Sequence, residues 1–144
     1  MIKFLLINDI RQIVENLSDV SHEFSGKKIL LTGGRGFLGR YFMEIFNQLD
    51  EKVLSEKLEL IVLDNLITSG KEGSEIPKYS NIHFINHNVT EKFKYDKDID
   101  YVIHAAGIAS PYYYRAYPLE TLEVAIIGTK TVSYTHLRAH ETDY

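Results

Sequence analysis

Four short apolar runs occur between residues 28 and 106, and each is bounded by glycine, charged or polar residues. Their lengths are typical of strands that are buried on both faces of a parallel sheet. The sequence therefore predicts strands over Ile29–Leu31, Leu58–Leu63, Ile82–Ile85 and Tyr101–Ala106.

Helical periodicity fills the segment between the first two predicted strands. Apolar residues recur there every four positions, mostly in adjacent pairs, which places one buried stripe on a helix: Phe37, Leu38, Tyr41, Phe42, Ile45, Phe46 and Leu49. A second helix is expected from Pro118, since proline suits the first turn. Its expected buried side consists of Leu119, Leu122, Ala125, Ile126 and Thr129. Strands that alternate with helices predict an α/β fold with a doubly wound parallel sheet.

The segments outside these elements are polar or only weakly patterned. Residues 1–25 are expected to form an N-terminal helical extension that packs on the domain and adds no chemistry. Asn8 and Asp9 would cap its helix, whose apolar positions are Ile10, Ile13, Val14, Leu17 and Val20. Residues 50–57 are mostly charged and predict a solvated connection, and residues 68–77 predict a loop.

Composition narrows the possible functions. The 144 residues suit one domain and carry a net charge of −4, so no basic surplus exists for nucleic acid. The absence of cysteine excludes disulfides, thiolate zinc sites and thiol catalysis. His136 and His140 are four residues apart, a spacing that can bind a metal ion on a helix. Position 137 is Leu rather than the Glu of the His-Glu-x-x-His motif, so no metal site is expected. The early apolar run Phe4–Ile7 is too short for a membrane span, and we expect a cytoplasmic chain without a membrane partner.

A glycine triplet follows the first predicted strand and opens the first predicted helix. Its spacing is Gly33-x-x-Gly36-x-x-Gly39. In such a turn the first glycine permits the tight bend, the second lets backbone approach a pyrophosphate, and the third lets helix and strand pack closely. The N–H groups and dipole of the helix N-terminus bind phosphate without a formal cation. This pattern indicates a dinucleotide site.

An acidic residue supports that interpretation. Asp64 ends the second strand, 25 residues beyond Gly39, where a carboxylate accepts hydrogen bonds from the adenosine ribose and repels a 2′-phosphate. The alternative is that Asp64 only caps the following turn. Arg35 offers a guanidinium that could pair with a 2′-phosphate. The position of Asp64 favours NAD over NADP.

Four segments together resemble the NAD-dependent epimerases and dehydratases of the extended short-chain dehydrogenase/reductase family. They are Thr32–Gly39, Leu63–Gly70, His104–Gly107 and the pair Gly128-Thr129. The stretch from Ala109 to Pro118 looks most like UDP-glucuronate decarboxylases, followed by dTDP-glucose 4,6-dehydratases. The resemblance implies a Rossmann-type sheet, truncated here after about four strands, with residues 26–132 forming the N-terminal part of the NAD-binding domain.

The resemblance also implies a role for each matching position. The pyrophosphate would lie against Gly33, Gly36, Phe37, Leu38 and Gly39. The adenosine ribose would be held by Asp64 and Asn65, and the adenine by Asn88 and Val89. Ala105, Ala106 and Gly107 would pass under the cofactor, and the nucleotide-sugar substrate would face Ser110, Tyr112 and Tyr113. Ala125 stands where many members have Asn.

Chemistry in this family begins when NAD takes a hydride from the sugar ring, with a Tyr of Tyr-x-x-x-Lys as general base. No Lys of this chain has Tyr four residues before it, so no catalytic residue is assigned and we expect the chain alone to be inactive. An alternative is a non-catalytic regulator that senses NAD. A third is that the chain barely folds and associates through the open edge of its last strand.

The last segment fits no element of the family. Residues 133–144 resemble translated sequencing adapter, and we expect a non-native tail after Val132.

The family forms dimers through helices, so a homodimer is a possible assembly. Outside the assigned site, His83 and His87 are interpreted as surface or hydrogen-bonded histidines. His104 is interpreted as a packing residue, with the alternative that it orients groups behind the site from the end of the fourth strand. The tyrosines at 112–114 are interpreted as a loop that covers the cofactor or substrate rather than a base-stacking surface.

Overall fold

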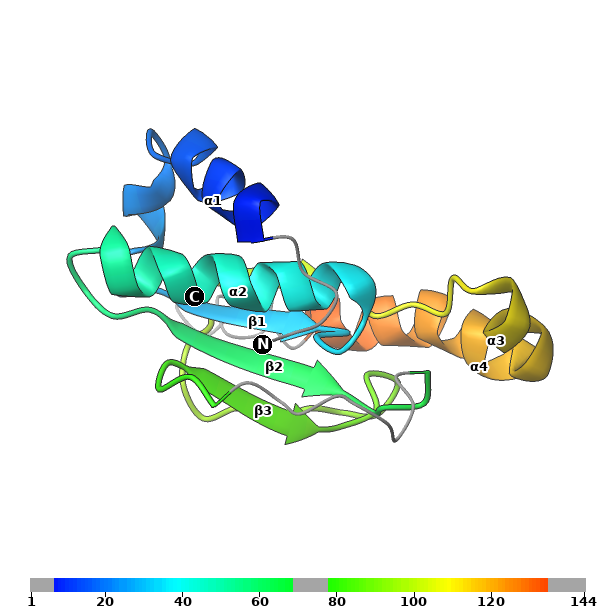
Figure 1. Ribbon diagram of the computed structural model, residues 1–144. Helices are drawn as coiled ribbons and strands as arrows, with labels where there is room; N and C mark the ends of the chain where they lie inside the picture. Colours follow the sequence, from blue (N-terminus) through cyan, green and yellow to red (C-terminus); the bar gives the residue numbers. More distant parts are fainter. Residues whose placement is uncertain (1–6, 69–77, 135–144) are drawn as a thin grey trace.

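A four-stranded parallel sheet forms the centre of the computed structural model, which describes residues 7–68 and 78–134 (Figure 1). Its strands are β1 (Lys28–Thr32), β2 (Glu59–Asp64), β3 (Ile82–Asn86) and β4 (Tyr101–His104), in the spatial order β3-β2-β1-β4. The chain adds β2 and β3 on one side of β1 and then crosses to the other side for β4. The predicted α/β fold with a doubly wound parallel sheet is therefore confirmed.

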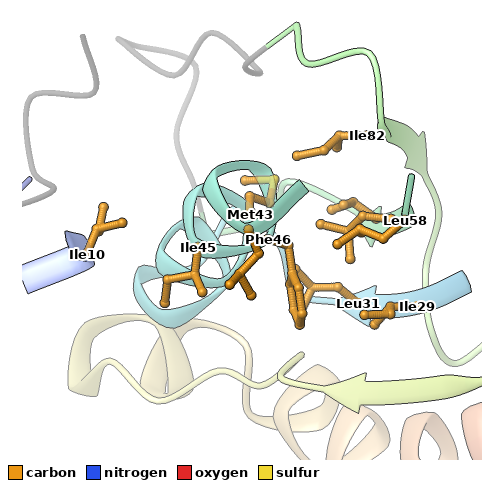
Figure 2. Packing of buried hydrophobic residues seen from close by; sticks show 11 residues of the cluster. Ile10, Ile29, Leu31, Met43, Ile45, Phe46, Leu58 and Ile82 are labelled. Atoms are coloured by element: carbon orange, nitrogen blue, oxygen red, sulfur yellow. The ribbon is translucent and has the colours of Figure 1, made fainter. Parts of the chain in front are cut away.

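Successive strand residues enter two separate cores, one on each face of the sheet. Ile29 and Leu31 of β1 pack toward helix α2 (Phe37–Lys52), which contributes Met43, Phe46 and Leu49 (Figure 2). The residues between them face the second core, which consists of Leu30, Ile61, Leu63, Val89, Ile99, Val124 and Val132. Burial on both faces explains why the central strands β1 and β2 are continuous apolar runs rather than alternating ones.

The N-terminal segment lies on the outer side of α2 (Figure 1). Helix α1 (Ile7–Asn16) already includes Asn8 and Asp9, so the predicted cap at these residues is wrong. The chain leaves the helix before Leu17 and forms a 3₁₀ turn, η1 (Ser21–Phe24), which leaves Val20 half exposed. Phe24 then packs edge-on against rings at 5.4 and 5.8 Å, those of Phe46 and Tyr101.

The sequence predicted a solvated connection over residues 50–57, but one of its charged residues is buried. Helix α2 continues to Lys52, and the side chain of Asp50 is 2% exposed. Its Oδ1 accepts a hydrogen bond from the Leu58 N–H at 2.8 Å, and its Oδ2 pairs with Lys57 Nζ at 2.9 Å. A charged residue is buried here because it caps the amide that opens β2.

The C-terminal helices bury a different side from the predicted one. After α3 (Pro111–Ala116) and α4 (Pro118–Glu123), a π-helical turn, η2 (Val124–Gly128), leads into a helix that continues through residue 134. The buried residues are Val124, Gly128 and Val132, whereas the residues expected to be buried are exposed: Leu119, Leu122, Ala125, Ile126 and Thr129.

Gly128 explains this choice of face. A Cβ at Gly128 would lie 3.0 Å from a methyl of Val89, so the small residue lets the helix lie close to the second core. Helices α3 and α4 extend beyond the sheet (Figure 1), where the large apolar side chains of α4 find no strand to cover. Of the predicted tail, residues 133 and 134 continue the helix, and the rest lies outside the described residues. Most of the predicted loop 68–77 lies outside them as well.

Candidate functional site

A cleft opens at the carboxyl ends of the strands. Its walls come from the segments that follow all four strands and from the start of the last helix: Gly33, Gly36, Leu63, Asp64, Asn65, Ile67, Thr68, His87, Asn88, Val89, Thr90, Ala105, Ala106, Gly107, Ile108, Glu120, Glu123 and Val124. The strand order reverses between β1 and β4, which is where open α/β sheets bind ligands. The fold therefore places the cleft where a ligand site is expected.

The glycine turn after β1 forms one wall through very close backbone contacts. Gly33 has φ of +72°, and a Cβ there would lie 2.6 Å from the Ala105 carbonyl oxygen. A Cβ on Gly39 would lie 2.5 Å from the Cα of Gly34, so this glycine lets α2 pack against the turn. At Gly36 a Cβ would meet only the Gly33 carbonyl, at 3.2 Å. Gly36 thus leaves open space in front of the first turn of α2, where helical N–H groups lack helical partners.

The carboxylate of Asp64 accepts hydrogen bonds from both the glycine turn after β1 and the turn after β2. Its Oδ2 accepts a hydrogen bond from the Arg35 N–H at 2.7 Å, and its Oδ1 accepts one from the Leu66 N–H at 2.8 Å. Asp64 therefore does cap its own turn, but it also faces the cleft. A carboxylate has about four acceptor positions, so two backbone bonds leave capacity for ligand hydroxyls.

Arg35 does not stand at the cleft, although its sequence position next to the glycines suggested that it could. Only 3% of the residue is exposed, and it is not among the described residues that line the cleft. Burial, followed by the nearby charge of Arg40, lowers the pKa of Arg35. The cleft-lining residues include three carboxylates, those of Asp64, Glu120 and Glu123, and in this described set there is no Lys or Arg.

The segment after β3 forms the wall next to Asp64. Asn88 Oδ1 accepts a hydrogen bond from the Thr90 N–H at 3.1 Å, and Val89 is buried in the second core. His87 also lines the cleft, whereas the sequence suggested a surface or hydrogen-bonded histidine outside the site. Its ring Nε2 lies 3.2 Å from the Glu91 carbonyl oxygen, and its backbone N–H donates to Asp64 O. Its position after a strand could have identified it, because every strand of the sheet delivers residues to this edge.

The remaining predicted site residues divide into two groups. Phe37 and Leu38 open α2 and are 71% and 61% exposed, and their predicted contribution through backbone N–H groups stays a prediction. Ser110, Tyr112 and Tyr113 stand at the start of α3 and are not among the residues that line the cleft. Tyr112 is 75% exposed and packs edge-on against Tyr113. Their assignment to a substrate stays a prediction.

Two further carboxylates line the cleft, although no sequence pattern indicated that they would. Glu120 and Glu123 lie one turn apart on α4, which comes to the cleft because Val124 and Gly128 pack against Val89. The apolar pattern of this helix predicted a different buried side, so the orientation of its polar residues could not be predicted either.

Comparison with known proteins agrees with this geometry. The model of the NAD dependent epimerase/dehydratase family matches residues 29–140. The chain belongs to this family. UDP-glucuronic acid decarboxylase 6 of Arabidopsis thaliana is 34% identical over 106 residues, which are 73% of this chain and 29% of that protein. UDP-glucuronic acid decarboxylase 1 of Danio rerio is 36% identical over 104 residues, which are 72% of this chain and 23% of that protein.

One solved structure has a similar fold over the part that it shares with this chain. It is a UDP-N-acetylglucosamine 4-epimerase from Methanobrevibacter ruminantium M1, in complex with UDP-N-acetylmuramic acid, with a TM-score of 0.51 and 26% identity. The match covers 80% of this chain and 34% of that one. The chain thus spans about a quarter to a third of the length of the family members it matches. In the described part of the chain, no helix is long and apolar enough to span a bilayer.

Proposed function

We propose that this chain is the NAD-binding part of an enzyme that modifies nucleotide sugars. The observation that carries this proposal is the cleft in which the glycine turn, the N-terminus of α2 and Asp64 meet. Gly33 and Gly36 would admit the pyrophosphate to the first turn of α2, where backbone N–H groups bind it. Asp64 and Asn65 would hold the adenosine ribose, and Asn88 and Val89 would face the adenine.

NAD is the expected cofactor rather than NADP. A 2′-phosphate on the adenosine ribose would approach the Asp64 carboxylate in a cleft where two further carboxylates, Glu120 and Glu123, also lie. Arg35, the basic residue within the glycine turn, is 3% exposed and is not among the described residues that line the cleft. Like charges at close range disfavour the phosphorylated cofactor, whereas hydroxyl groups are good donors to Asp64.

The reaction class rests on the relatives, which are UDP-glucuronic acid decarboxylases and an epimerase of a UDP-sugar. NAD, when bound, would supply a transient acceptor for hydride from the sugar ring. Because relatives 34% and 36% identical are decarboxylases and the epimerase structure is 26% identical, we place the whole protein with the decarboxylases and dehydratases before the 4-epimerases. Tyr-x-x-x-Lys does not occur in the 144 residues, so this chain alone should bind NAD without converting a sugar nucleotide.

Calorimetric titration of oxidised NAD into the 144-residue chain tests the proposal. We expect Gly36→Val to weaken binding more than tenfold, because its side chain fills the space before the α2 N-terminus. Asp64→Ala should weaken it as well, and Asp19→Ala, a substitution of an exposed carboxylate outside the cleft, should leave it unchanged. Circular dichroism checks that each variant is folded. Unchanged affinity in both cleft variants, or a wild-type chain that does not bind NAD, would refute the assignment.

A further inference from the structure

Three groups meet where β1 and β4 end. The hydroxyl Oγ1 of Thr32 lies 2.7 Å from Nδ1 of the His104 ring and accepts a hydrogen bond from the Ala106 N–H at 3.2 Å. The carbonyl of Thr32 accepts a second backbone bond, from the Ala105 N–H, also at 3.2 Å. Thr32 is fully buried, and Ala105 and Ala106 form part of the cleft. The hydroxyl therefore connects a ring behind the cleft to the backbone that lines it.

Only one of these hydrogen bonds has a direction fixed by its groups. An amide N–H can only donate, so the Thr32 oxygen must accept at Ala106. The bond to His104 depends on the ring tautomer: with the ring proton on Nε2, Nδ1 carries a lone pair and accepts the hydroxyl proton of Thr32. Burial lowers the pKa of His104, which favours this neutral ring.

We propose that His104 is a positioning residue for the dinucleotide: its unprotonated Nδ1 orients the Thr32 hydroxyl, which holds the Ala105–Gly107 backbone against the glycine turn. The contact that depends on this alignment is very close, because a Cβ on Gly33 would lie within 2.6 Å of Ala105 O and 2.7 Å of Ala106 Cα. A shift of this backbone changes the cleft between β1 and β4, where the strand order reverses. The inference rests on the proposed function for the identity of its ligand.

The protonation state of the ring tests the first half of the proposal without any ligand. Nitrogen-15 spectra of the full chain at neutral pH, with the His104 signals assigned from a His104→Asn sample, should show a lone pair on Nδ1 and a proton on Nε2. Thr32→Val should change this tautomer population, because the donor is gone, whereas Thr32→Ser should keep it. A proton on Nδ1 in the wild-type chain, or a tautomer that Thr32→Val leaves unchanged, would overturn the proposal.

Titration with oxidised NAD tests the second half. His104→Leu and Thr32→Val should each weaken binding about tenfold, which is the effect of about one buried hydrogen bond. The double variant should be no weaker than either single one, because both remove the same interaction. His104→Asn, which offers an amide oxygen as acceptor, and Thr32→Ser should recover most of the affinity. His83→Leu, on β3 outside the described cleft walls, is the matched control.

The outcomes separate the two proposals. Full affinity in His104→Leu, additive losses in the double variant, or no recovery in His104→Asn would overturn the positioning role while NAD binding by the wild type stands. A wild-type chain that does not bind NAD would overturn the proposed function and the ligand assigned to this role. The tautomer would still show whether the Thr32–His104 bond exists.

Discussion

Replacing Gly33 by alanine should lower the stability of the fold, whereas replacing Gly36 by alanine should weaken NAD binding with little change in stability. At Gly33 the backbone has φ of +72°, and an added Cβ would meet three backbone atoms of residues 105 and 106 at 2.6 to 2.7 Å. The left-handed conformation costs an L-residue roughly 1–2 kcal/mol. Displacing packed backbone adds about 1–3 kcal/mol, as overpacking does in protein cores. Gly33→Ala should therefore lower the free energy of unfolding by about 2–5 kcal/mol, a large share of the roughly 5–15 kcal/mol of a typical domain.

The same substitution at Gly36 should have little effect on stability. Its φ is −67°, which alanine adopts freely, and the added Cβ would contact only the Gly33 carbonyl oxygen at 3.2 Å. The reduced freedom of the unfolded chain stabilises by about 0.4–1 kcal/mol, whereas alanine is a poorer helix N-cap by a similar amount. The net change should stay within about 1 kcal/mol. Binding of NAD should nevertheless weaken, because the methyl group enters the space before α2.

Urea denaturation followed by far-ultraviolet circular dichroism measures both free energies, since the helices and the sheet give the signal. Gly107→Ala is the control for stability, because a Cβ there meets no described atom within 4 Å. If Gly33→Ala were as stable as Gly36→Ala, the close contact between the glycine turn and the end of β4 would be wrong. The geometry on which the cleft depends would be wrong with it.

Two further predictions concern carboxylates away from the cleft. The pKa of Asp100 is lowered mainly by a hydrogen bond that its carboxylate accepts from the Lys28 backbone N–H. The ionised carboxylate therefore stabilises the fold at pH values above its ordinary pKa of 3.8. This contribution is lost as the pH falls through the lowered pKa. Urea denaturation between pH 7 and pH 2 measures the free energy of unfolding of the wild type and of Asp100→Asn. At neutral pH the wild type should be more stable by about 1–2 kcal/mol, and in acid the difference should vanish. A difference that does not depend on pH would contradict this prediction. Asp50→Ala should cost about 2–3 kcal/mol, because the buried Leu58 N–H loses its charged acceptor. Lys57→Ala, whose side chain is 72% exposed, should cost less than about 1 kcal/mol, and equal losses in the two variants would contradict the role of that amide.

The sheet could be predicted because its signals are local. Each strand is a short apolar run, and Gly33 and Asp64 mark the carboxyl ends of β1 and β2 whatever the rest of the chain does. The same locality made the glycine turn and its acid recognisable as a candidate dinucleotide site. Residues that follow a strand reach the cleft because parallel strands end at one edge.

The last helix could not be predicted in the same way. Its apolar residues include four in a row, at positions 124–127, so periodicity alone allows several buried sides. The choice depends on a long-range fit between Gly128 and Val89. The orientations of Glu120 and Glu123 follow from that fit. The burial of Asp50 and of Arg35 depends in the same way on partners and packing that no sequence window contains.

Leu66 gives the turn after β2 a property that a glycine there would remove. Its φ of 62° is unfavourable for a branched side chain, and its N–H is held by Asp64 Oδ1 at 2.8 Å. The same carboxylate accepts from the Arg35 N–H through its other oxygen, so both oxygens of Asp64 are fixed by backbone at the cleft wall. The unfavourable angle at Leu66 and the fixed orientation of the Asp64 carboxylate therefore depend on each other.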